Sequence, residues 1–147
     1  MMRVADGEWG VLAAVREQLR QGASQIKLMG GGGVASPYDP LYTLQFTPQE
    51  LRAAVTAAEG YGTYVATHVY SVAGIERAFD AGMKSIEHGH LADEPTIAML
   101  AERDVWLSTQ PFAEHDHIVS NPENAEKNRG PLLARPEIRL WRHFAAG

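Results

Sequence analysis

The sequence predicts an α/β fold in which about four parallel strands alternate with helices. Three observations support this prediction. Short β-type apolar runs alternate with helical apolar stripes through the first 112 residues, and glycine or proline separates them. The interval from His68 to His88 is 20 residues, which is one helix plus one strand. Strands joined by single helices in right-handed crossovers form a parallel sheet. The pattern suits a barrel segment or a doubly wound sheet, and periodicity alone leaves both open.

The first half of the chain predicts two helices around one strand, at residues 7–21, 25–29 and 47–60. The first helix carries an apolar stripe of Val11, Leu12, Val15 and Leu19. The last of the three elements opens with Thr47, then a first-turn proline, then Glu50, which is the pattern of a capping box. Both helices are followed by glycine, a common helix stop.

The second half continues the alternation with three more strands and two more helices. β-branched and aromatic residues predict the strands, and amphipathic stretches predict the helices. Strands are expected at 63–70, 84–89 and 105–112, and helices at 71–82 and 94–104. Asp93 is placed to cap the last of these helices.

Composition excludes several functional classes. The chain is 45% hydrophobic and 21% charged, with a net charge of −5, so no basic footprint for nucleic acid is present. Without cysteine there are no disulfides, thiol nucleophiles or cysteine-bound zinc. No apolar run approaches the ~20 residues that a membrane span needs. We therefore expect a cytoplasmic protein with no nucleic-acid or membrane partner.

Three polar residues recur at the ends of successive predicted strands: Lys27, His68 and His88. The carboxyl ends of parallel strands lie at one edge of the sheet, where active sites of such folds are built. Two neutral imidazoles with one further ligand form an ordinary site for zinc or another divalent metal. An ammonium would repel the metal, so Lys27 can join only when neutral or after carbon dioxide converts it to an anionic carbamate.

The segments "QIKLMGGGGVASP", "YVATHVYS" and "IEHGHL" resemble the strand-four, strand-five and strand-six motifs of the amidohydrolase superfamily. The most similar branch holds imidazolonepropionase-like and Xaa-Pro or Xaa-Arg dipeptidase-like enzymes. The resemblance implies that Lys27 is the carboxylated bridging lysine, that His68 and His88 bind the second metal, and that Tyr70 contacts the substrate or the developing oxyanion. His90 departs from the small or amide residue usual after this motif, and is assigned to a substrate or supporting contact.

The resemblance also implies a partial TIM-type (β/α) barrel, equivalent to strands four to seven, over residues 1–112. A whole barrel takes ~250 residues, and this chain has 147. The His-x-His of the family's first strand and the aspartate of its eighth are not among the predicted elements. His115 and His117 form a His-x-His, but in a polar stretch that we expect to be a solvated loop. Residues 113–147 are predicted to be an irregular loop followed by a helix.

The expected function is metal-dependent hydrolysis of an amide or peptide C–N bond in a small molecule or dipeptide, with an incomplete ligand set. One alternative is a hydrolytic deaminase of the same superfamily. Another is an inactive truncated fragment or self-associating scaffold that binds no metal. Because a partial barrel leaves open strand edges, we expect a homo-oligomer.

Three further residues or segments carry structural expectations. The run Gly30–Gly33 is interpreted as a flexible loop rather than an anion-binding nest. Glu87 is expected to point away from His88, because neighbouring residues of a strand face opposite sides. Trp106 is expected in the core or at an interface.

Overall fold

The computed structural model describes residues 3–33 and 38–109, and within them one sheet is formed. Its strands are β1 (Ile26–Met29), β2 (Val65–Ser71), β3 (Ser85–Leu91) and β4 (Trp106–Ser108). The four strands lie in the order β1-β2-β3-β4, and each pairs in parallel with the next. The predicted parallel sheet is therefore confirmed.

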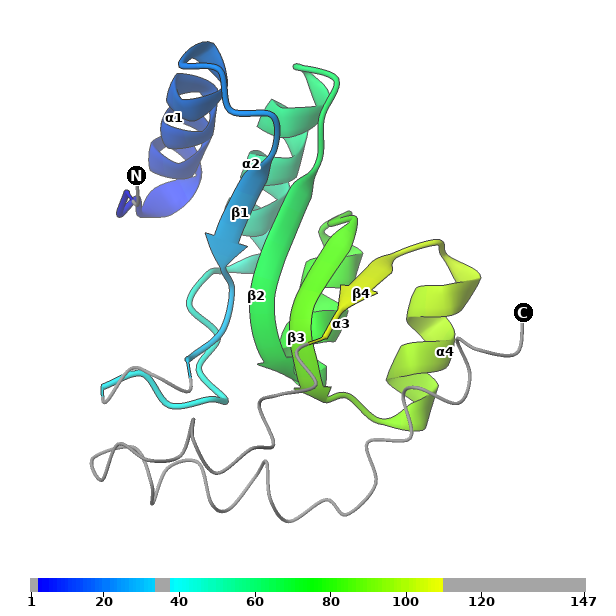
Figure 1. Cartoon of the computed structure of the whole chain (residues 1–147). Coiled ribbons are helices and arrows are strands. Elements are labelled where there is room, and N and C mark those ends of the chain that lie inside the picture. Colours follow the sequence, from blue (N-terminus) through cyan, green and yellow to red (C-terminus); the bar gives the residue numbers. More distant parts are fainter. Residues whose placement is uncertain (1–2, 34–37, 110–147) are drawn as a thin grey trace.

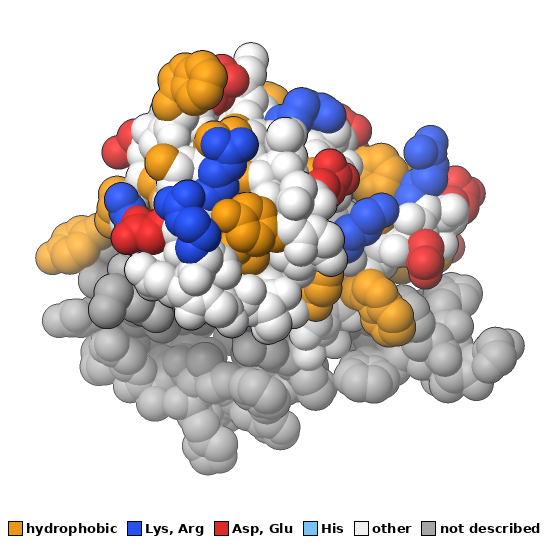
Figure 2. Space-filling model, turned by 90° about the horizontal axis from the view of Figure 1, so that it is seen from above, with side chains coloured by type: hydrophobic (Ala, Val, Ile, Leu, Met, Phe, Trp, Pro, Cys, Tyr) orange, Lys and Arg blue, Asp and Glu red, His pale blue; other side chains and the backbone are white. Residues whose placement is uncertain are grey.

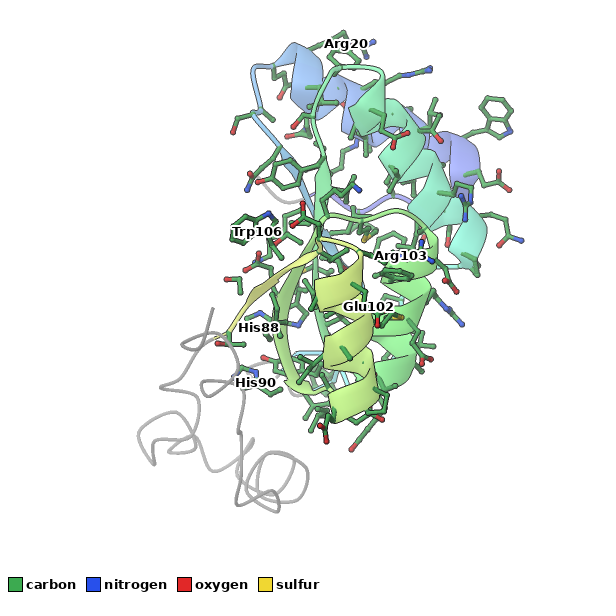
Figure 3. All side chains as sticks on the ribbon, turned by 90° about the vertical axis from the view of Figure 1, so that its right-hand side faces the viewer. Arg20, His88, His90, Glu102, Arg103 and Trp106 are labelled. Atoms are coloured by element: carbon green, nitrogen blue, oxygen red, sulfur yellow. The ribbon has the colours of Figure 1, made fainter. Side chains whose placement is uncertain are left out.

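The helices are α1 (Gly7–Arg20), α2 (Pro48–Glu59), α3 (Val72–Asp80) and α4 (Glu94–Glu102). Figures 1 and 3 show that these helices lie on one side of the sheet, and none of the helices in residues 3–33 and 38–109 lies on the other side. A doubly wound sheet reverses its strand order and carries helices on both sides. The sequential order and the single helical layer instead form a segment of a (β/α) barrel.

Local signals in the sequence explain where the helices begin. Thr47 accepts a hydrogen bond from the Glu50 backbone, and the Glu50 carboxylate accepts one from the Thr47 backbone, which completes the predicted capping box. Asp93 caps α4 through the backbone N–H of Thr96, at 3.0 Å, as predicted. Ser71 ends β2 and caps α3 in the same way.

The core lies between the helices and the sheet. Its most completely buried side chains come from both layers: Val11, Val65, Ile75, Met83, Ile86 and Leu100. On the side away from these helices the sheet exposes Met29, at 37%, and Trp106, at 74%. Trp106 projects away from the helices in Figure 3, so it lies outside the core of the described structure, and its expected alternative place at an interface stays a prediction. In a closed barrel, the side of the sheet away from the helices is the concave interior.

Strand β3 continues to Leu91, beyond its predicted end at Gly89. The pairing with β2 shifts register between Val69 and Ser71, which marks a β-bulge. Opposite this shift, His88 has φ 74° and Gly89 has φ 61°. A histidine in the left-handed region is uncommon and is held there by surrounding structure, often at functional sites.

The amino-terminal end of the strands has a mixed surface. Figure 2 looks onto the amino-terminal end, where basic and acidic side chains mix with scattered apolar ones and no histidine is visible.

Among the helices of the described ranges, none is long and apolar enough to cross a membrane. The predicted boundary at residue 112, the segment 113–147, His115 and His117 lie outside the described residues.

Candidate active site

Four aromatic and imidazole rings form one buried cluster in β2 and β3, defined by His68, Tyr70, His88 and His90. Their exposed fractions are 7%, 4%, 8% and 5%. The His68 and His88 ring centroids are 4.4 Å apart, with the rings edge to face. Tyr70 stacks on His88 at 5.0 Å and on His90 at 5.7 Å. Figure 3 shows His88 and His90 toward the carboxyl-terminal end of the sheet.

Strand alternation and the bulge together place these rings on one side. His68 and Tyr70 are two residues apart in β2 and therefore share a face. His88 would face the opposite way on a regular strand, because Glu87 before it is the register partner of His68. The left-handed backbone at His88 breaks the alternation and brings its ring against His68. Glu87 therefore lies on the same side of the sheet as His68 and not, as expected from simple alternation, on the side away from this site.

His68 is held in one ring orientation by the backbone. Its Nε2 lies 2.9 Å from the carbonyl oxygen of Gly32. A carbonyl can only accept, so Nε2 carries the proton and donates. Burial lowers the pKa of His68, which favours the neutral imidazole, although the bond to Gly32 opposes this shift. In the neutral ring the Nδ1 lone pair is then the one able to bind a metal or accept a proton.

The run Gly30–Gly33 is packed against backbone rather than left loose. A Cβ on Gly32 would overlap the carbonyl oxygen of Pro40, and one on Gly30 would overlap the Thr67 hydroxyl. Gly31 donates its N–H to the His68 carbonyl at 2.9 Å. Close approach of two backbones thus explains the glycines, and the prediction of a flexible turn misses this constraint.

Tyr70 is a neutral hydrogen-bond donor in its ring cluster. Burial raises the pKa of its hydroxyl to about 12. At neutral pH the phenol therefore keeps its proton and can donate it to a developing oxyanion. Its stacking between His88 and His90 fixes the ring plane, with an angle of 12° to His88 and 29° to His90.

Lys27 lies on the same side of the sheet as the ring cluster but one pleat nearer the amino-terminal end. Its register partner is Ala66, whereas the partner of His68 on β1 is Met29. Lys27 is exposed, and its positive charge contributes to the lowered pKa of His68. The structure thus brings the two histidines into contact and places the lysine within electrostatic reach of one of them.

The donor set fits a divalent metal in part. Two imidazoles in contact, one with its Nε2 proton already held by a backbone carbonyl, are arranged as metal-binding histidines usually are. Within residues 3–33 and 38–109, however, no group of three or more His, Cys, Asp or Glu side chains is placed to hold an ion. A third donor from these residues would have to be another kind of group, and a carbamate on Lys27 is one.

Sequence reasoning missed two residues near the loop that contacts His68. Asp39 lies close enough that its charge raises the pKa of His68. Gln45 donates from its side-chain amide to Asp39 at 2.9 Å. Both residues lie in the irregular segment between β1 and α2, where no periodicity marks them. The one available signal was the charge of Asp39, since no other residue from 30 to 49 is charged.

Comparison with known proteins identifies the family. The profile of the amidohydrolase family matches residues 2–145. Ochratoxinase of Aspergillus niger is 39% identical over 125 residues, which are 84% of this chain and 26% of the ochratoxinase. A crystal structure of an amidohydrolase has a TM-score of 0.83 and 41% identity, over 90% of this chain and 33% of the other. A prolidase in complex with N-methylphosphonate-L-proline has a TM-score of 0.79 and 39% identity, over 88% and 33%.

The chain thus spans about a quarter of ochratoxinase and about a third of each matched structure. These relatives are TIM-barrel proteins, and the match over part of their length agrees with the four-stranded segment. The prolidase agrees with the dipeptidase-like branch that the motifs indicate. On the family profile, the ochratoxinase identity and the shared fold, this chain belongs to the amidohydrolase family.

Proposed function

We propose that this chain carries part of the active site of a metal-dependent hydrolase that cleaves an amide or peptide C–N bond. The observation that carries the proposal is the contact of the His68 and His88 rings, 4.4 Å between centroids, with the Nε2 proton of His68 held by Gly32. The ochratoxinase and prolidase likenesses support a small amide or dipeptide, such as one ending in proline, as substrate.

The residues divide the work by their chemistry. His68 and His88 would hold zinc or another divalent ion, which supplies Lewis-acid polarisation of a carbonyl when bound. Lys27 would contribute after its neutral amine bonds to the carbon of carbon dioxide and releases a proton, which leaves a carbamate anion. Tyr70 would donate its phenol proton toward the substrate oxygen, and His90, stacked on it, would hold or contact the substrate.

Metal content tests this function. Purified chain given zinc and bicarbonate is expected to retain about one metal per chain, and His68→Ala or His88→Ala to retain much less. His143→Ala is the matched control, since no role is assigned to that histidine. Wild-type protein that holds far less than one metal per chain would rule out the hydrolase proposal for this chain.

The carbamate has its own test. With ¹³C-bicarbonate, wild-type protein should show a carbamate carbon signal by NMR that Lys27→Arg lacks. Lys84→Arg, at an exposed position, should keep the signal. Loss of the signal in both variants, or in neither, would contradict assignment to Lys27.

A scaffold that binds no metal is the second candidate. One observation that favours it is Trp106, which the described sheet exposes on the side away from its helices. Strands β1 and β4 are also edges of the four-stranded sheet. This candidate proposes self-association of the chain, and a monomer by light scattering at micromolar concentration would contradict it.

A further inference from the structure

We propose that Gln45 is a positioning residue, whose side-chain amide ties the glycine run to Asp39 and so holds the Gly32 carbonyl against His68. The consequence is one fixed tautomer of the His68 ring. We call this set of hydrogen bonds from Gln45 the clamp. The effect of the clamp on metal binding rests on the proposed function.

One nitrogen of the Gln45 side chain donates to two acceptors. The side-chain Nε2 lies 2.9 Å from Asp39 Oδ1 and 3.3 Å from the Gly31 carbonyl oxygen. Both partners are oxygens that can only accept from it, so the amide group must present its NH₂ to them. One side chain therefore joins the glycine run to the segment that carries Asp39.

The backbone of the same residue adds a second attachment. The Gln45 N–H donates to the Gly30 carbonyl at 3.2 Å, and Leu44 pairs with Gly31 in an isolated antiparallel bridge. Gly32 is already seated against the Pro40 carbonyl with no room for a side chain. The glycine run and residues 39–45 therefore form one packed unit that sets the position of the Gly32 oxygen.

Asp39 is held where it can act on the same ring. A Cβ built on Gly33 would lie 3.7 Å from His68 Nε2 and 3.9 Å from Asp39 Oδ2, so both groups approach Gly33. The bond from Gln45 orients the carboxylate through its other oxygen. Without the bonds from Gln45, the segment that carries Asp39 is no longer tied to Gly31, and the Gly32 carbonyl is free to move away from His68 Nε2.

The test reads the tautomer of the metal-free, full-length chain by long-range ¹H–¹⁵N NMR. The wild-type His68 ring is expected to be protonated at Nε2 and not at Nδ1. Gln45→Glu replaces both donors with acceptors that face two oxygens, and Gln45→Leu removes the donors, so each should give a mixture of tautomers. Gln49→Glu makes the same chemical change at an exposed position of α2 and should leave the ring unchanged.

Asp39→Asn separates charge from hydrogen bonding, since the new amide oxygen can still accept from Gln45, and it should keep the wild-type tautomer. A wild-type ring protonated at Nδ1 would overturn the proposal. So would folded Gln45 variants with an unchanged tautomer. If both Gln45 variants unfold by circular dichroism, the clamp serves folding rather than His68, and the proposal likewise falls.

Zinc titration supplies the link to function. Loss of a group that supports a metal ligand usually weakens metal binding on the order of 10-fold or more, so Gln45→Leu should raise the zinc Kd by at least about 10-fold. If wild-type protein binds no zinc, the proposed function fails. The tautomer measurement still decides the clamp in that case.

Discussion

The helix-covered face of the sheet and the carboxyl-terminal parts of its middle strands are built from different chemistry. Under the helices the buried residues are aliphatic, as at Val65, Ile75 and Ile86. In β2 and β3, only a few residues away, the buried residues include His68 and His90. The first region resembles any hydrophobic core, whereas the second buries polar rings, which costs free energy unless their polar atoms are paired.

This difference separates stability from chemistry within one small sheet. Aliphatic packing between the helices and the sheet stabilises the strands. This packing does not determine which polar residues stand at the strand ends. The loops and the bulge then place particular atoms, such as the Gly32 carbonyl and the His68 ring, through hydrogen bonds and close contacts. Substitutions in the first region should therefore change stability most, and those in the second should change local geometry most.

The largest expected effect is Ile75→Ala, under the helices. Ile75 is fully buried, and deletion of its side chain should lower the free energy of unfolding by about 3 to 4 kcal/mol. Ile97→Ala removes the same atoms at a half-buried position and should cost clearly less. Denaturant unfolding measures both. Equal losses in the two variants would show that the helix layer does not carry stability as described.

Gly32→Ala probes the other region and should lower stability by about 1 to 3 kcal/mol, since a Cβ there overlaps the Pro40 carbonyl. Gly10→Ala is the same substitution at a helical position with nothing within 4 Å. It should stabilise α1 by about 0.5 to 1 kcal/mol. Thermal unfolding measures both changes in stability, which should have opposite signs. A Gly32→Ala variant with unchanged stability would mean that Gly32 is not packed against Pro40.

The sequence predicted the elements well because their signals are local. The capping box at Thr47, the Asp93 cap and the glycine stops each act within a few residues, so helix and strand positions follow from short stretches. The missed features depend on contacts between distant segments. The left-handed backbone at His88 arises at the bulge against β2, and the tight packing of Gly32 depends on Pro40 in another segment.

The candidate site was predicted in its residues but not in its geometry. Strand-end position was enough to nominate His68 and His88, which the structure brings into contact. It could not show that Glu87 lies beside His68, because alternation assumes a regular strand. It could not identify Gln45 either, since a loop glutamine becomes informative only when its acceptors are placed.

A smaller effect is expected for Thr47→Ala, at the start of α2. The threonine hydroxyl accepts from the Glu50 N–H at 3.3 Å, and its loss should cost about 1 kcal/mol. Thr56→Ala, on an exposed face of the same helix, should be neutral or slightly stabilising. Urea unfolding compares the two variants. If Thr56→Ala lowers the free energy of unfolding as much as Thr47→Ala does, the capping box does not account for the effect at Thr47.

The smallest effect is expected in the pH dependence contributed by Glu50. Its pKa lies below the usual 4.5, chiefly because its carboxylate accepts from the Thr47 N–H at 2.7 Å and next from the Gly7 N–H at 2.6 Å. A carboxyl whose pKa is lower in the folded state stabilises the fold above its unfolded pKa, and that stabilisation is lost as the pH falls through the folded pKa. Unfolding free energies measured from about pH 6 to about pH 3 should therefore fall more steeply for wild type than for Glu50→Gln. Solvent screening keeps the difference small, because the group is close to the surface. Glu59→Gln, exposed at the other end of α2, should keep the wild-type slope, and a wild-type slope in Glu50→Gln would show that the link from α2 to Gly7 does not form in solution.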